Sequence, residues 1–365
     1  MNESPRDFRL IEAVPNFSEG QNKAIIQQIV DAMALDAQGR QREGMRILHV
    51  DSGAAANRTV ITLAGHPEAV TEALFWGIQK ATECIDMRKH RGVHPRIGAT
   101  DVCPLIPLQD ISMRETVRLA RKLAQRVAEN LQLPVFLYEA ARLKEERKRL
   151  ATIRKGEFEG LAEKLQDMQW QPDFGPSTPH PTAGAVVIGA RPFLIAFNVH
   201  LDTQDVQIAR TIARTIRESS TSQSLKGLRA IGWYVEEYGL AQVSMNITDV
   251  VQTPLHQAFE SVKRVATEMG IGVKGSEIIG LVPLACMLEA GMYYAAEMHL
   301  HLSPTEKEDR SIQLAIQQMG LNRLKPFQPD QKILEYVLQQ HADIFFLKKT
   351  PLPLIIPAAS DIYPM

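Results

Sequence analysis

The densest group of reactive side chains in the sequence lies in residues 89–101, KHRGVHPRIGATD, where His90 and His94 stand among three cationic residues. An imidazole titrates near neutral pH, so a histidine in a loop rich in glycine and proline can serve as a general base. Arginine binds a carboxylate through two parallel hydrogen bonds. The stretch therefore predicts an acid–base site for an anionic substrate, with a solvated basic turn as the alternative.

The spacing of His90 and His94 suggests a second interpretation. On a helix, two histidines four residues apart lie on one face and can share a metal ion. Gly92 lies between them and Pro95 follows, so this segment is not expected to be helical. We expect no metal, and a metal-dependent amidohydrolase built on His90, His94 and Asp101 is kept as a rival interpretation.

Two further clusters place polar side chains at the predicted ends of strands. Asp51 ends one predicted strand, a turn follows, and Arg58 begins the next strand. Loops at strand ends commonly carry site residues, and a turn-forming aspartate beside an exposed arginine is the alternative. Residues 15–20, PNFSEG, lie between a strand and a helix, where helix capping alone explains Ser18.

Hydrophobic periodicity predicts the elements that position these clusters. The first half contains, in order, a strand near 8–14, a helix over 22–35, strands over 46–51 and 59–65, a helix from 66, and a strand over 101–108. The second half repeats this order: a strand over 193–201, a helix over 205–219, a pair of strands, a helix over 255–269, and a strand near 276–282. Each half has the order of a split βαβ unit. We predict an α/β (α+β) protein of two similar ferredoxin-like subdomains with mixed sheets.

Between the halves, Ser112 and Glu115 form a capping-box pattern that opens a helix ending near 131, and a strand is expected over 135–139. The charged run LKEERKRL, residues 143–150, is interpreted as a solvated helix face. The subdomain boundaries are predicted at 8–185 and 186–340, and residues 341–365 form a proline-rich tail.

Composition excludes several classes of protein. The 365 residues contain 41 Lys and Arg against 42 Asp and Glu, so no field of one sign suggests binding to nucleic acid or membrane. No apolar run approaches the ~20 residues that span a bilayer, and the N-terminus lacks the apolar core of a signal peptide. The three cysteines form no C-x-x-C pair. We expect a cytoplasmic protein.

Six sequence blocks, in this order and spacing, resemble the formiminotransferase domain of the glutamate formimidoyltransferase family: VPNFSEG, VDSG…NRTV, KHRGVHPRIGATDVCPLIP, DFGPS…GA, GARPFLIAFNV and AIGWYVEE. The resemblance runs from about Ile11 to Tyr336. It implies transfer of the formimino group from N-formimino-L-glutamate to N5 of tetrahydrofolate, a co-substrate, with release of L-glutamate in histidine degradation. It also implies a homodimer, with the folate held between the two subdomains.

The resemblance implies site residues as well. The family's catalytic histidine matches His94, and its associated acidic residue matches Asp51. The family's folate-binding segment matches Phe174, Gly175, Pro176, Ser177, Thr178, Pro179, His180, Pro181, Thr182, Ala183 and Gly184. From chemistry alone, Arg58 and Arg96 are our candidates for binding the carboxylates of the amino-acid donor.

The sequence differs from the bifunctional relatives because no helical cyclodeaminase domain follows the transferase match, so we expect a separate cyclodeaminase to take the product. Within the folate segment, Pro179, His180 and Ala183 replace bulky apolar residues of those relatives. Two alternatives stay open: formyl transfer from N-formyl-glutamate to folate, and a folate-binding carrier without turnover.

Overall fold

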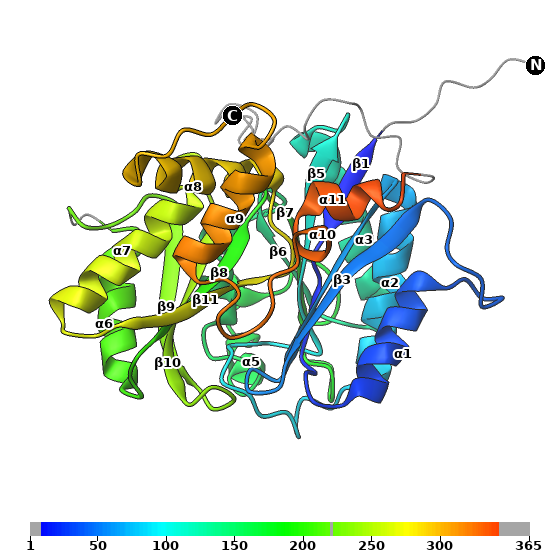
Figure 1. Cartoon of the computed structure of the whole chain (residues 1–365). Coiled ribbons are helices and arrows are strands. Elements are labelled where there is room, and N and C mark those ends of the chain that lie inside the picture. The colour runs from blue at the N-terminus through cyan, green and yellow to red at the C-terminus, as the bar shows by residue number, and fades with distance from the viewer. Residues whose placement is uncertain (1–8, 220–221, 343–365) are drawn as a thin grey trace, which may run out of the picture. The chain divides into compact units, whose positions relative to one another are not determined.

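The computed structural model of the chain describes residues 9–219 and 222–342, which divide into two compact units (Figure 1). Unit 1 extends to Pro192, and unit 2 spans Phe193–Gln340. The boundary predicted at 185/186 lies earlier, in front of a strand that pairs within the first sheet. Apart from residues 341 and 342, the predicted proline-rich tail lies outside the described residues.

Unit 1 carries one seven-stranded sheet and its helices. The strands are β1 (Leu10–Ala13), β2 (Asn16–Phe17), β3 (Met45–Gly53), β4 (Arg58–Gly65), β5 (Thr100–Gln109), β6 (Val135–Glu139) and β7 (Val186–Ala190). The helices are α1 (Lys23–Ala34), α2 (Pro67–Cys84), α3 (Met113–Leu131), α4 (Leu150–Arg154) and α5 (Leu161–Lys164), with short 3₁₀ turns η1 (Glu145–Lys148) and η2 (Met168–Trp170).

The strand pairing confirms the split βαβ order in unit 1. β1 lies between β4 and β5 and is antiparallel to both. β3 pairs with the other edge of β4 and is also antiparallel to it. The chain therefore crosses by α1 from β1 to β3 and by α2 from β4 to β5, each time skipping one strand. β7 then adds to β5 in parallel, and β6 adds to β7 in parallel. These two parallel pairs make the first sheet mixed, as predicted.

Apolar side chains hold helices on both faces of this sheet. One core cluster joins the sheet to α1, α2 and α3, which lie together on one side of it (Figure 1). A second cluster places Ile153, Leu161 and Leu165 against Phe136 and Val187 on the strands. The predicted capping box of α3 is present, with both of its reciprocal hydrogen bonds.

Unit 2 repeats the split βαβ order in a four-stranded sheet, β11–β8–β10–β9. Its strands are β8 (Ile195–Leu201), β9 (Leu228–Val235), β10 (Leu240–Ile247) and β11 (Val273–Ile279), and its helices are α6 (Val206–Ile216), α7 (Leu255–Glu268), α8 (Leu284–Glu297), α9 (Lys307–Met319), α10 (Pro329–Lys332) and α11 (Leu334–Gln339). Every pair in this sheet is antiparallel, because the strands that run in parallel are separated by one strand. The predicted mixed pairing therefore applies to the first sheet.

Residues 143–150, interpreted as a solvated helix face, are mostly exposed and contain the 3₁₀ turn η1, but Arg147 does not fit this interpretation. Arg147 is fully buried, its Nη1 lies 2.6 Å from Asp173 Oδ2, and its guanidinium lies 5.1 Å from the centre of the Phe136 ring. A buried guanidinium needs such partners because an unpaired buried charge is costly.

Among the described residues, no helix is both long enough and apolar enough to cross a bilayer.

Candidate active site

The three polar clusters singled out in the sequence meet in unit 1. Ser18 donates its hydroxyl hydrogen to the Gly98 carbonyl at 2.7 Å. The Asn57 side chain accepts from the Gly20 N–H at 2.9 Å and donates to the Arg91 carbonyl at 2.8 Å. These bonds hold the connection between α2 and β5, residues 85–99, against the two strand-end turns.

His90 is held within the protein by both of its ring nitrogens. Its Nε2 lies 2.8 Å from the Asn57 carbonyl, so Nε2 carries the hydrogen, and its Nδ1 accepts from Arg96 Nε at 3.1 Å. The segment is not helical, as predicted. Within the described residues, no three His, Cys, Asp or Glu side chains cluster as metal ligands. This arrangement gives the amidohydrolase interpretation no support.

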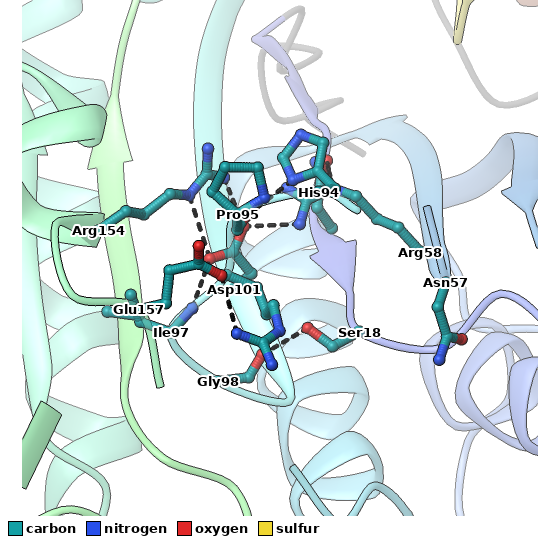
Figure 2. Close-up of polar contacts among 12 residues, drawn as sticks. Ser18, Asn57, Arg58, His94, Pro95, Ile97, Gly98, Asp101, Arg154 and Glu157 are labelled. Atoms are coloured by element: carbon teal, nitrogen blue, oxygen red, sulfur yellow. Dashed lines mark hydrogen bonds and ion pairs between the residues drawn. The ribbon is translucent and has the colours of Figure 1, made fainter. Parts of the chain in front are cut away.

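Asp101 lies at the centre of the site and is completely buried (Figure 2). Its Oδ2 accepts from Arg58 Nη1 at 2.6 Å, and both of its oxygens accept from Arg154. The Ile97 N–H also donates to Oδ1 at 3.1 Å. Two guanidiniums thus share one carboxylate, and the group as a whole carries a positive charge.

Burial and the neighbouring charges act in opposite directions on the pKa values of Asp101 and Arg58. Burial alone would raise the pKa of the Asp101 carboxyl, but the guanidiniums of Arg154 and Arg58 outweigh it and hold the pKa at about 2. Burial lowers the pKa of Arg58 to about 10, against the opposing attraction of Asp101. At neutral pH Asp101 and Arg58 are therefore both charged.

His94 lies beside this group in the neutral form. Its Nδ1 is 2.8 Å from the Pro95 carbonyl, which can only accept, so Nδ1 carries the hydrogen and Nε2 carries the basic lone pair. Burial, followed by the charges of Arg58 and Arg154, lowers the pKa of His94 well below its usual value, while Asp101 opposes them. A neutral imidazole with a fixed tautomer can accept a proton as a general base, while the lowered pKa makes it a weaker base than an ordinary histidine.

Asp51 lies in β3, opposite Val60 of β4, and is partly exposed. The charge of the Asp101 carboxylate acts on the pKa of His94. The role of Asp51 in orienting the imidazole stays a prediction.

The two arginines predicted to bind the donor each hold a protein carboxylate. Besides Asp101, Arg58 contacts Asn16 Oδ1 through its Nε at 2.9 Å. Arg96 is buried and donates to Glu157 at 2.8 Å and to both oxygens of Glu159 at 2.8 and 2.6 Å. Beside it lies a pocket of about 400 Å³ lined by Arg91, Gly92, Arg96, Gly156, Glu157 and Glu159. Binding of the donor by Arg58 and Arg96 stays a prediction.

The predicted folate segment, residues 174–184, is attached at one end to β6 and at the other to the connection that carries His94. The Val135 N–H donates to the Phe174 carbonyl at 2.9 Å, and the Ala99 N–H donates to the Ala183 carbonyl at 2.9 Å. Between these anchors the side chains of Ser177, Thr178 and Pro181 are exposed. The segment is thus joined directly to the connection that carries His94.

Gly98 permits this close attachment. A Cβ at this position would lie 1.9 Å from the Ala185 carbonyl oxygen and 2.6 Å from that of Ala183, distances that no side chain tolerates. Glycine is needed where two backbones approach this closely.

The sequence interpretation missed Arg154, Glu157 and Glu159. They lie in RKGEFEG, residues 154–160, where Gly156 and Glu157 both adopt positive φ, at 91° and 55°. A non-glycine residue in this region is uncommon and often marks a functional segment. The available signal in the sequence was the alternation of charged residues and glycines.

Comparison with known families and proteins gives matches along most of the chain. The model of the formiminotransferase domain, N-terminal subdomain, matches residues 10–191, and that of the formiminotransferase domain matches residues 196–339. The glutamate formimidoyltransferase of Streptococcus pyogenes serotype M1 is 43% identical over 78% of this chain and 93% of its own length. That of Thermoplasma acidophilum is 42% identical over 78% and 92%.

A longer relative, the formimidoyltransferase-cyclodeaminase of Rattus norvegicus, is 44% identical over 90% of this chain. The match spans 60% of that relative's length. Both halves of the present chain are matched by family models, in the order that its two units follow. The chain therefore belongs to the formiminotransferase domain family.

Proposed function

We propose that this protein transfers the formimino group from N-formimino-L-glutamate to N5 of tetrahydrofolate and releases L-glutamate. Relatives that carry the name glutamate formimidoyltransferase are 42–43% identical to it. The observation that carries the proposal is His94, whose Nδ1 hydrogen faces the Pro95 carbonyl and whose pKa lies well below the usual value. This histidine is neutral at physiological pH and ready to accept a proton.

The reaction exchanges one amine for another at the formimino carbon. N5 of the folate forms a bond to this carbon and loses a proton, and the bond from carbon to the glutamate nitrogen breaks as that nitrogen gains a proton. His94 Nε2 accepts the first proton and returns it to the leaving nitrogen, so no net charge is left on the enzyme. General acid–base catalysis of this kind contributes about 10²–10⁴ in rate.

The surroundings of His94 suit this exchange. The amino-acid donor carries carboxylates and a cationic amidinium, and the pocket beside Arg96 offers both arginine and glutamate side chains. We assign Arg58 and Arg96 to the donor's carboxylates, Asp51 to the orientation of the imidazole, and residues 174–184 to the folate. Holding both substrates in line can lower the barrier by up to about 7–11 kcal/mol, more than proton transfer contributes.

The proposal extends to the state and setting of the protein. We place the folate between the two subdomains of a cytoplasmic homodimer, and a separate cyclodeaminase as the enzyme that takes the product. The fusion of the two activities in the name formimidoyltransferase-cyclodeaminase supports this sequence of reactions.

The test is a spectroscopic assay with purified protein, tetrahydrofolate and N-formimino-L-glutamate. Acid converts the 5-formimino product to 5,10-methenyltetrahydrofolate, which absorbs in the near ultraviolet. Parallel reactions contain N-formyl-L-glutamate as donor, and the His94→Ala variant is the control. We expect a signal that requires both substrates and is lost in the variant.

Each other outcome identifies an alternative. A signal with the formyl donor alone would replace formimino transfer by formyl transfer. Folate binding without turnover on either donor would favour the carrier, and the absence of folate binding would overturn the proposal.

A further inference from the structure

Arg154 reaches the site from a short helix that the sequence did not predict. It is the last residue of α4, its side chain is 14% exposed, and it donates to both oxygens of Asp101. A helix of five residues leaves most of its carbonyls without partners inside the helix. The position of Arg154 therefore depends on what holds the end of α4.

The ammonium group of Lys164, on α5, holds that end. Its Nζ donates to the carbonyls of Ile153 at 2.5 Å, Lys155 at 2.9 Å and Thr152 at 3.3 Å. The first two are the residues on either side of Arg154. Nζ also lies 4.2 Å from the centre of the Trp170 ring, a cation–π contact.

The environment of Lys164 fits this role. Burial, with the nearby charges of Lys155 and Arg147, lowers its pKa to about 8. Removing the ammonium group from water is unfavourable, and its contacts with the backbone carbonyls and the Trp170 ring offset part of this desolvation free energy. α4 and α5 also share the apolar cluster formed by Ile153, Leu161 and Leu165.

We propose that Arg154 is a positioning residue for His94, which shares the Asp101 carboxylate with Arg58 and is itself held in place by Lys164. The inference rests on the proposed role of His94 in proton transfer. Among the charged groups that act on the imidazole are Arg58 from β4, Arg154 from α4 and Asp101 from β5. Burial favours the neutral imidazole most, Arg58 and Arg154 favour it further, and Asp101 opposes them. Without Arg154, one of the two cationic contributions would be lost.

The test follows the protonation of His94 itself, by NMR titration of its ring resonance in the full-length chain. The chain contains ten histidines, and the His94→Asn spectrum identifies the resonance. In Arg154→Met we expect the midpoint to rise by about 1 pH unit, the lower end of the effect of a nearby charge. Arg154→Lys should retain most of the native value, because it retains the charge.

Lys164→Met should shift the midpoint in the same direction by a smaller amount. In the double variant Arg154→Met/Lys164→Met the midpoint should equal that of Arg154→Met alone, because Lys164 acts through Arg154. Arg264→Met, which removes an exposed salt bridge to Glu268 in unit 2, is the matched control and should leave the midpoint unchanged.

An unchanged midpoint in Arg154→Met, with a lower melting temperature, would reduce Arg154 to a structural role and overturn the proposal. Additive shifts in the double variant would overturn the part played by Lys164. Should Arg154→Met not fold, Lys164→Met and Arg154→Lys carry the test, and equal midpoints in Lys164→Met and the native chain would contradict it. The titration needs no turnover, so an inactive protein with the expected shifts would refute the proposed function and leave the positioning role intact.

Discussion

The two units share one order of strands and helices but differ in the connection before their last strand. In unit 1, residues 85–99 join α2 to β5 and carry His90, His94 and Arg96. In unit 2, residues 269–272 join α7 to β11 in one tight turn. The same topology thus accommodates a long polar loop in one copy and a minimal link in the other. The chemistry belongs to the loop and the scaffold positions it.

The histidines of the two units also have different surroundings. In unit 2, His200 is fully buried on β8, and its Nε2 lies 3.4 Å from Glu277 on β11. Glu277 Oε1 in turn accepts from Asn198 and Gln242, each at 3.1 Å. Neutral amides stand here where unit 1 places two guanidiniums. Unit 2 thus pairs a histidine directly with a carboxylate, whereas the carboxylate of Asp101 in unit 1 is paired with two arginines.

Removal of the candidate base should have the largest effect. We expect His94→Ala to lower kcat by about 10²–10⁴, because the proton acceptor is lost. The matched control is His301→Ala, an exposed histidine of unit 2, which should stay within twofold of the native kcat. A His94→Ala enzyme that retains most of its kcat at saturating substrates would show that the long loop of unit 1 does not supply the base.

The next largest effect is expected at the shared carboxylate. Asp101→Asn should lower the free energy of unfolding by about 3–5 kcal/mol, because two arginines lose their buried partner. Glu277→Gln in unit 2 should cost about 1–2 kcal/mol, because its partners include neutral amides. Asp202→Asn, whose salt bridge to Lys274 is half exposed, should cost less than about 1 kcal/mol. Urea denaturation measures all three, and equal losses at Asp101 and Glu277 would remove the contrast between the units.

A smaller effect should follow from backbone crowding. Gly98→Ala places a Cβ against two carbonyls and should cost about 1–3 kcal/mol, with a higher KM for folate, because the folate segment is attached there. Gly272→Ala, in the short connection of unit 2, meets only the Asp202 side chain, at 3.6 Å, and should change stability by less than about 0.5 kcal/mol. Thermal unfolding with folate titration measures both variants. Tolerance of alanine at Gly98 would mean that the two backbones can separate without loss.

The smallest expected effect is the pH dependence of stability and of kcat that follows from the lowered pKa of His94. Because the pKa of His94 is lowered in the folded protein, the unfolded chain binds more protons at mildly acidic pH. The contribution of His94 to the free energy of unfolding is therefore fully present above about pH 6.5, the usual histidine pKa, and falls as the pH drops below this value. The acid limb of the kcat profile should lie below pH 6.5 for the same reason. A limb above this value would mean that burial and the arginine pair do not lower the pKa of His94.

Much of the fold followed from local patterns. The repeated order of elements was visible because helices and half-buried strands impose different hydrophobic periods. The capping box at Ser112 was correct because it depends on residues three positions apart. The mixed pairing expected of both sheets held in unit 1 alone, since it depends on β7, which comes from a segment outside the split unit.

The candidate site was predicted only in part. Residues 89–101 contain His94 and Asp101, so their chemistry could be recognised from residue types. The partner of Asp101 could not, because Arg154 lies 53 residues further along the chain in a run of similar charges. For the same reason Arg147 was placed on a solvated face, although it is buried against Asp173.

The sequence by itself therefore determined the kinds of element, their doubled order, and the group of residue types that can perform proton transfer. These features depend on neighbours within a few positions along the chain. The tertiary structure alone decided which arginines contact Asp101, which ring nitrogen of His94 bears the hydrogen, and which segment holds the end of α4. Such pairings depend on how distant segments pack, since a charge is tolerated in the interior only where the fold brings a partner to it.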